Sequence, residues 1–489
     1  MNWYKFPESR FPFELALLFQ FALFLPLYEA PKNLLWLGYT VTWLWNRWHS
    51  KEWGGPWRYW DTLILFWIAS GFVVAYFAGT HHSEWRGAND ILRYGSIFWC
   101  IRRSDYTRED FSRLAELLLV SCVIGVAWGL WDCHGSGQRG GIELNSVGAN
   151  NHSAAYIGIC IGLLLSWILA RTGDKSPVNR AKLLLIMIFL LGALIDGASR
   201  GTLGALVLVP ILLGMGWRQH RRRQVIFYIA SFYLIYLVIA AAVGFAGLSD
   251  GNSVIARKWG SVEWKISDKA TGMPARTAVV GKSKNDGVIA LPDSDKTTAK
   301  NAESVESKKA SKEVGVEARP VVIGQSREDG GITISHRDTI WRRALIGWEA
   351  YPWFGLGMDN FNQISDDMVR QRVEAEGKSY RREDYIGANH AHNLYLNTLA
   401  ERGLFGFLIF GTVLISWVAT LWRYRPAADA SDTEWMFWGG SLSAWTIISF
   451  AGIFNTTLHH EIALLALILF GGWQSLALTH KHGNRKQSD

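Results

Sequence analysis

The sequence predicts an all-α protein that crosses a membrane many times, with about twelve transmembrane helices and one large polar loop. Three observations lead to this fold class. Of the 489 residues, 49% are hydrophobic. The apolar residues gather in repeated blocks that approach the ~20 residues needed to cross a bilayer, whereas a soluble chain would show shorter amphipathic segments. The 26 Trp and 16 Tyr suit the aromatic belts found at membrane surfaces.

The expected spans follow one another through short connections, except across the large loop. They are placed at 11–27, 33–45, 62–79, 89–101, 114–131, 154–170, 183–198, 203–216, 225–247, 404–421, 436–455 and 461–479. No small-residue cleavage site follows the first block, so it is expected to be an anchor and not a signal peptide.

Basic residues follow every even-numbered span. Arg221, Arg222 and Arg223 follow the eighth, for example, and Arg423 and Arg425 follow the tenth. Because cytoplasmic loops are rich in Lys and Arg, both termini are expected in the cytoplasm and the odd-numbered exits on the opposite side. Topology therefore accounts for the net charge of +8. Membrane lipids are expected partners, and nucleic acid is not.

These patterns divide the chain into four regions. Residues 1–247 hold the first nine spans, and 404–489 hold the last three with a cytoplasmic tail. The insertion 248–330 is rich in Lys, Ser, Ala, Gly and Asp without a sustained period, which predicts flexible or weakly structured chain. Region 331–403 is the expected site loop. Its apolar residues recur at helical spacing over 336–350, which predicts an amphipathic helix on the membrane surface.

A cluster of polar side chains closes this loop, just before the tenth span. Asn389, His390, His392, Asn393 and Tyr395 lie where water is expected to give way to hydrocarbon. A neutral imidazole accepts a proton near neutral pH, so His392 is the proposed general base. Asn389 or Asn393 could orient it or hold a sugar hydroxyl. His390 competes for the same role, and a purely structural histidine is the alternative.

Three arginines on the same predicted side are candidate phosphate ligands. Arg200 lies in the turn between the seventh and eighth spans, where a charge is costly unless it meets an anion or carboxylate. Pairing with Asp196, or snorkelling, is the alternative. Arg337 and Arg342 lie on the predicted interfacial helix and could grip a diphosphate with their forked guanidinium groups. Attraction to anionic lipid headgroups is the alternative, and it weighs more for Arg342.

The polar loop 148–153 opens the sixth span on the same side. Asn151 could bind sugar or phosphate there, while helix capping by Asn151 or Ser153 explains the pattern equally well. No cysteine or histidine spacing predicts a metal site or a disulfide framework.

Taken together, the motifs resemble the superfamily of O-antigen ligases and O-antigen polymerases, which includes protein O-oligosaccharyltransferases. The resemblance extends over about 150–410, and the insertion before His336 is longer than expected for the family. The matching pieces are Ser199-Arg200-Gly201, Arg337-x-x-x-Trp341, Gly355-x-Gly357, Phe361, His392-Asn393-Leu394-Tyr395-Leu396 and Glu401-x-Gly403-x-x-Gly406.

The resemblance implies a metal-independent, cofactor-free glycosyltransferase of the bacterial inner membrane with its site on the periplasmic face. The donor would be a glycan on undecaprenyl diphosphate. The acceptor would be lipid A–core, a second lipid-linked glycan or a protein hydroxyl. His392 would be the base, and Arg200 and Arg337 the diphosphate ligands.

Among the three activities we prefer the ligase, because no dedicated peptide-binding domain follows the last span. A transporter of lipid-linked substrates is the rival from another class. It is disfavoured because transporters tend to have symmetric halves, whereas the polar segment here separates nine expected spans from three. A scaffold that binds partners through the insertion is a third reading.

Overall fold

The computed structural model describes residues 10–135, 142–171, 177–197, 199–217, 222–249 and 334–486, apart from 383, 384 and 386. Every regular element in these residues is a helix, and one isolated β-bridge joins Leu144 to Gly148. The predicted all-α class is therefore confirmed for the described part of the chain. The insertion 248–330, beyond its first two residues, lies outside that part.

Each of the twelve expected spans falls on a helix, and the bounds below replace the expected ones. The helices before the insertion are α1 (Pro12–Phe24), α2 (Glu29–Ser50), α3 (Tyr59–Tyr76), α4 (Glu84–Arg102), α5 (Arg108–Gly135), α6 (Asn150–Ala170), α7 (Pro177–Asp196), α8 (Arg200–Gly216) and α9 (Arg222–Ser249). After it come α11 (Ile334–Ala350), the 3-10 turn η2 (Phe361–Gln363), α12 (Asp366–Ala375), α13 (Leu394–Arg423), α14 (Asp432–Ala451) and α15 (His460–Lys486).

Five of the described helices are long and apolar enough to cross a membrane. They contain the candidate spans Tyr59–Tyr76, Arg108–Cys133, Asn150–Ala170, Leu394–Arg423 and His460–Ala477. The chain therefore has the helices of a multi-pass membrane protein, while the count of twelve spans stays a prediction. The helix expected at 336–350 is present as α11, and its place on a membrane surface also stays a prediction.

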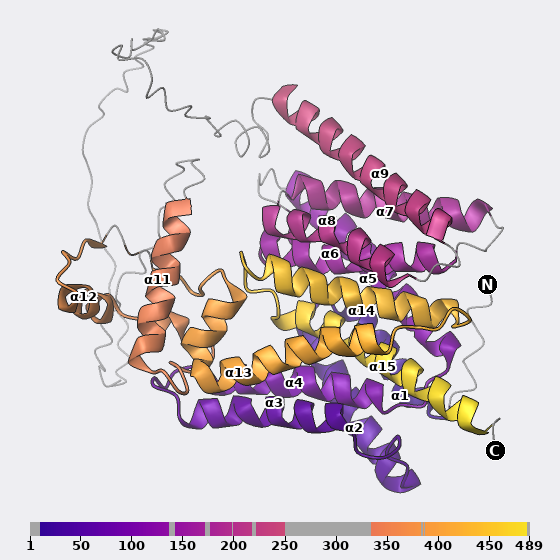
Figure 1. The fold of residues 1–489 in the computed structure, drawn as a ribbon, viewed down its shortest axis with the longest axis horizontal. Coiled ribbons are helices and arrows are strands. Elements are labelled where there is room, and N and C mark those ends of the chain that lie inside the picture. Colours follow the sequence, from indigo (N-terminus) through magenta and orange to yellow (C-terminus); the bar gives the residue numbers. More distant parts are fainter. Residues whose placement is uncertain are drawn as a thin grey trace, which may run out of the picture. The chain divides into compact units, whose positions relative to one another are not determined.

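Helix α14 lies at the centre of the helical packing. It packs against α6, α8, α13 and α15, and nearly all of its residues are buried (Figure 1). Small residues allow the close approach. A β-carbon on Gly162 of α6 would lie 2.3 Å from the Ser443 side chain of α14. One on Gly439 would lie as close to Ser166 of α6. These contacts hold α14 against α6, and the end of α14 borders the candidate site.

Helix α13 is kinked at Gly403, whose φ is +59° and ψ −169°. The part before the kink runs beside α11, and the longer part after it packs along α3 and α14 (Figure 1). The chain after α11 fills the bend, since Leu356 and Gly357 donate backbone hydrogen bonds to the carbonyls of Ala400 and Glu401. A β-carbon on Gly355 would lie 2.4 Å from backbone atoms there. The two predicted glycine motifs therefore meet, and they fix α11 against α13.

Candidate functional site

The start of α13 is tied to the end of α14. The backbone N–H of Leu394 donates to the carbonyl of Gly452 over 2.7 Å, and the Asn393 side chain donates to the carbonyl of Ile453 over 3.0 Å. Asn393 also caps α13, because its side-chain oxygen accepts from the backbone of Tyr395 and Leu396. Its amide thus holds the segment that carries the histidines, and direct contact with substrate stays a prediction.

His392 has a left-handed backbone conformation, with φ of +48°. This conformation costs a residue other than glycine about 1–2 kcal/mol, so neighbouring contacts must hold it. On one side Ala391 donates its N–H to the Asn397 side chain over 2.9 Å, and on the other side Asn393 is fixed as the cap. The half-buried imidazole is therefore placed by its surroundings, as is common for residues at functional sites.

Phe454, two residues beyond Gly452, borders both predicted arginine positions. The guanidinium carbon of Arg337 lies 5.7 Å from the centre of its ring. A β-carbon on Gly201 would lie 3.3 Å from Phe454 Cβ, so the start of α8 packs against the same residue. Arg200 is the first residue of that helix, whereas the sequence placed it in the turn before the helix. Partial burial, and then the positive charge of Arg200, lower the pKa of Arg337. The two guanidinium groups are thus close enough to repel each other.

Arg200 is positioned from α6 as well as from α14. The Asn150 side chain donates to the carbonyl of Gly197 over 2.8 Å, at the end of α7 and just before the turn. Ser153 accepts from Leu144 and donates to Gly148, which folds the loop before α6. Ala149 is the residue that precedes the helix, so the alternative of helix capping by Asn151 or Ser153 is wrong. Asn151 is exposed in the first turn, and its binding role stays a prediction.

Five histidines from three segments lie in a row. Ring centres are 4.2 Å apart for His392 and His390, 6.1 Å for His390 and His152, 6.0 Å for His152 and His459, and 3.6 Å for His459 and His460. Burial, and then the neighbouring charges of His390, Arg337 and His152, lower the pKa of His392 to about 4. The pKa of His390 is lowered by burial. Both imidazoles are therefore neutral near pH 7 and can accept a proton.

A small cavity of about 90 Å³ adjoins His459, and its wall contains both polar and apolar side chains. Its lining includes Asp90, Tyr94, Asn397, Glu401 and His459. Within the described residues, His459 Nδ1 has no hydrogen-bond partner, and its burial lowers the pKa of His459 well below the usual value. The cavity is large and polar enough for water or a substrate hydroxyl.

The other predicted site residues bond to other parts of the protein or lie at the exposed edge of the site. Arg342 pairs with Glu376 over 2.6 Å, which ties α11 to α12, so it does not join Arg200 and Arg337. Tyr395 donates its hydroxyl to the carbonyl of Ser449 over 2.8 Å. Asn389 is exposed beside His390. Contact of these side chains with substrate stays a prediction.

Three residues of this region were given no role of their own by the sequence analysis, although His152 belongs to the predicted polar loop 148–153. Phe454 links the turn at Arg200 to Arg337, and His152 and His459 extend the row of histidines. A signal for each was present. All three lie at the ends of expected spans, on the side where His392 was predicted. Among the residues that the structure describes, no group of three or more His, Cys, Asp or Glu side chains is arranged to hold a metal ion.

Comparison with known families gives a match over the middle of the chain. A family model described as O-antigen ligase matches residues 184–411, slightly less than half of the chain. Comparison with curated proteins gives no match. The matched stretch begins in α7 and ends in α13, so it includes Arg200, Arg337 and His392. The match confirms the resemblance to the O-antigen ligase-like superfamily, and it implies a glycosyltransferase-like enzyme of the ligase or polymerase type in a multi-pass membrane protein.

Proposed function

We propose that the chain transfers a glycan from undecaprenyl diphosphate to an acceptor hydroxyl on the periplasmic face of the bacterial inner membrane. Its preferred form is an O-antigen ligase with lipid A–core as acceptor. The observation that carries the proposal is the meeting of Arg200, Arg337 and His392 at the end of α14. Two cations beside a neutral base suit the displacement of a diphosphate by a hydroxyl group.

The donor diphosphate binds between Arg200 and Arg337 in this proposal. The two guanidinium groups repel each other, since the charge of Arg200 lowers the pKa of Arg337. An anion between them replaces this repulsion with two attractions, and each planar guanidinium can hold two phosphate oxygens. Partial burial strengthens these contacts relative to open water.

His392 accepts the proton of the acceptor hydroxyl. The hydroxyl oxygen forms a bond to the anomeric carbon while the bond from that carbon to the diphosphate oxygen breaks. The electron pair of the broken bond leaves with the diphosphate, whose growing negative charge the arginines stabilise. A single displacement of this kind inverts the anomeric carbon. The proposed chemistry needs no metal, because the leaving group is already activated and the cations come from the chain.

His392 is preferred to His390 as the base on the electrostatic evidence. The charge of Arg337 contributes to the lowered pKa of His392, whereas for His390 the cause is burial alone. His392 is therefore the histidine whose basicity responds to a proposed diphosphate ligand. The bound donor also adds negative charge that offsets the cations, so the pKa of His392 rises when the donor is present. The base becomes stronger only in the complex in which it acts.

Polymerase and protein O-oligosaccharyltransferase activities use the same donor and base, and only the acceptor differs. A deletion strain separates them through its surface glycans. Free lipid A–core with unattached polymer indicates a ligase, and single-repeat glycans indicate a polymerase. Normal lipopolysaccharide with unglycosylated protein indicates a protein transferase. The rival transporter is tested with purified protein in detergent, where an enzyme still joins donor to acceptor and a transporter leaves both unchanged.

A further inference from the structure

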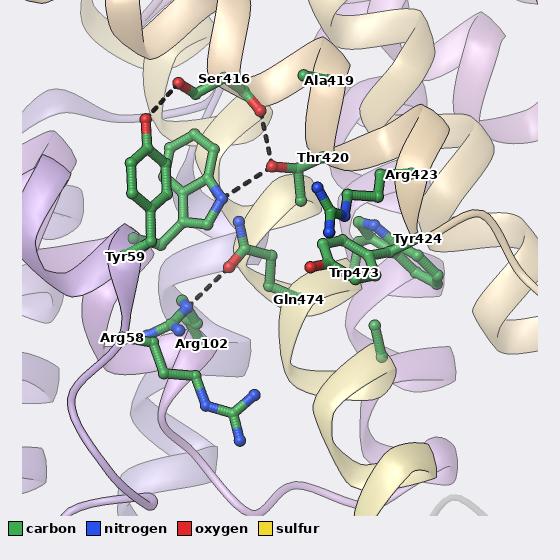
Figure 2. Close-up of a pocket in the computed structure, with 12 residues that line it drawn as sticks. Arg58, Tyr59, Arg102, Ser416, Ala419, Thr420, Arg423, Tyr424, Trp473 and Gln474 are labelled. Carbon is green, nitrogen blue, oxygen red and sulfur yellow. Dashed lines mark hydrogen bonds between the residues drawn. The ribbon is translucent and has the colours of Figure 1, made fainter.

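A second cavity lies at the opposite end of α13 from the histidines. It has a volume of about 480 Å³, within the usual range for ligand pockets, and it opens among α3, α13 and α15 (Figure 2). Three of its twelve lining residues are arginines and none is acidic. The twelve are Arg58, Tyr59, Trp60, Arg102, Ser416, Ala419, Thr420, Arg423, Tyr424, Trp473, Gln474 and Ala477.

The cavity lies at the level where candidate membrane spans end. Tyr59 is the first residue of one span, Arg423 the last residue of another, and Ala477 the last residue of a third. Tyr59 and Tyr424 are 59% and 41% exposed, as expected for aromatic side chains in an interfacial belt. Lipid headgroups occupy this level of a bilayer, so they meet the mouth of the cavity.

The polar groups in the wall offer donors in excess of acceptors. Arg102 pairs with buried Asp61 over 2.5 Å and donates to the Gln474 side-chain oxygen over 2.7 Å. Asp61 also pairs with Arg103 over 3.0 Å, so its charge is shared by two arginines. Arg58 and Arg423 add further positive charge to the same wall.

Two buried donors in the wall have no acceptor within the described residues. They are the indole Nε1 of Trp473, which is 2% exposed, and the amide Nε2 of Gln474, which is 6% exposed. A buried N–H without a partner is unfavourable, and a ligand rich in oxygen acceptors would satisfy it. Neighbouring donors are already used, since Trp60 donates to the Thr420 hydroxyl over 3.0 Å and Tyr59 shares a hydrogen bond with Ser416.

We propose that this cavity binds the phosphate headgroup of an anionic membrane phospholipid. The arginines and unpartnered donors recognise the phosphate oxygens, while Trp60, Ala419 and Ala477 offer apolar contact to the start of the lipid tails. Inorganic phosphate offers the same oxygen acceptors but has no lipid tails for the apolar contact. The site lies at the other end of α13 from His392, and the inference stands independently of the proposed glycosyl transfer.

The test is native mass spectrometry of the full chain, purified in detergent and titrated separately with phosphatidylglycerol, phosphatidylethanolamine and inorganic phosphate. We expect phosphatidylglycerol to bind at least about tenfold more tightly than the zwitterionic lipid, because it keeps the net negative charge. Arg423→Gln should weaken this binding about tenfold, the usual consequence of losing a hydrogen bond to a charged group. The double change with Arg58→Gln should weaken it further.

Arg425→Gln is the matched control, since it removes the same charge two residues away without touching the cavity wall. It should leave the affinity for phosphatidylglycerol within about twofold of wild type. Equal weakening by Arg423→Gln and Arg425→Gln would mean diffuse charge attraction and would overturn the site. Equal affinity for the two lipids would also overturn it. Binding of inorganic phosphate as tight as that of phosphatidylglycerol would overturn the assignment to a lipid.

Discussion

The two ends of α13 hold their cations in different ways. At the C-terminal end, buried Asp61 pairs with Arg102 and Arg103, so one carboxylate of the protein offsets part of the positive charge there. At the N-terminal end, Arg200 lowers the pKa of Arg337, and Arg337 lowers that of His392. Two guanidinium groups and an imidazole are thus neighbours at the end that also contains a strained backbone. Such an arrangement suits a site that is completed by an anionic substrate.

The largest expected effect comes from removing the proposed base. His392→Ala should lower turnover by about 10²–10⁴-fold, the range for loss of general base catalysis, with folding and membrane insertion retained. Transfer of glycan to acceptor by the purified protein measures it. His390→Ala serves as the control and should cost much less. If the His390 variant loses activity and the His392 variant keeps it, the base has been assigned to the wrong histidine.

A smaller loss of activity is expected when a proposed diphosphate ligand is replaced by another cationic residue. Arg200→Lys should lower kcat/KM by about 10–100-fold, because lysine cannot reproduce two parallel hydrogen bonds to phosphate. Arg342→Lys is the comparison, since Arg342 pairs with Glu376 away from the other two arginines. It should change kcat/KM by less than about threefold. Full activity of Arg200→Lys would favour a structural arginine.

The kink in α13 gives the next effect, on stability. Gly403 has a backbone conformation that is open essentially to glycine alone, and a β-carbon there would lie 2.4 Å from backbone atoms of Trp353. Gly403→Ala should therefore cost at least about 1–3 kcal/mol and lower the melting temperature. Gly411→Ala, in the same helix, meets no atom within 4 Å and should be neutral or slightly stabilising. Equal melting temperatures for the two variants would show that the kink is not required.

The pH dependence should separate the free protein from its complex with donor. His392 must be neutral to act, and its pKa in the free protein is lowered to about 4. Activity measured as kcat/KM should therefore persist down to a pH of about 5 and fall only as the pH drops through that pKa. The acid limb of kcat should lie at higher pH, because the bound diphosphate raises the pKa. If the acid limbs of kcat and kcat/KM fall at the same pH, the bound diphosphate does not change the pKa of His392, and the two groups are not neighbours.

The smallest effect is expected from a chelator. The proposed displacement uses cations of the chain, so treatment with EDTA should leave the rate unchanged within error. The control is the EDTA-treated preparation to which Mg²⁺ is added back. Loss of activity that Mg²⁺ restores would replace the metal-free scheme with a metal-assisted one.

Local patterns of the sequence were sufficient for the helices but only for part of the site. Apolar length predicted a helix at each of twelve positions, because the requirement for ~20 apolar residues is local. The helical spacing at 336–350 likewise predicted α11. The positions of the basic loops predicted that Arg200, Arg337 and His392 lie on the same side of the membrane. Their meeting depends on Phe454 and on the backbone contact at Gly355, which join segments far apart in the chain.

Two site residues show different limits of the sequence analysis. For Asn393 a local signal was present and was not used, and for Arg342 there was no local signal. Asn393 lies immediately before a helix, a position that favours an asparagine cap, and the structure gives it that role. Arg342 pairs with Glu376 across 34 residues, which no local pattern could indicate. The basic cavity was also out of reach of local patterns, because its arginines come from three separate segments.

The pKa of His392, followed by NMR of histidine-labelled protein, tests the central claim most directly. The claim is that Arg337 and His392 share one site with Arg200. Burial and the charge of His390 lower that pKa most, and the charge of Arg337 lowers it further. In Arg337→Gln the pKa should therefore rise above about 4 while burial keeps it below the ordinary value for histidine, and a diphosphate added to the wild-type protein should raise it as well. A pKa that neither the substitution nor the diphosphate moves would contradict the shared site.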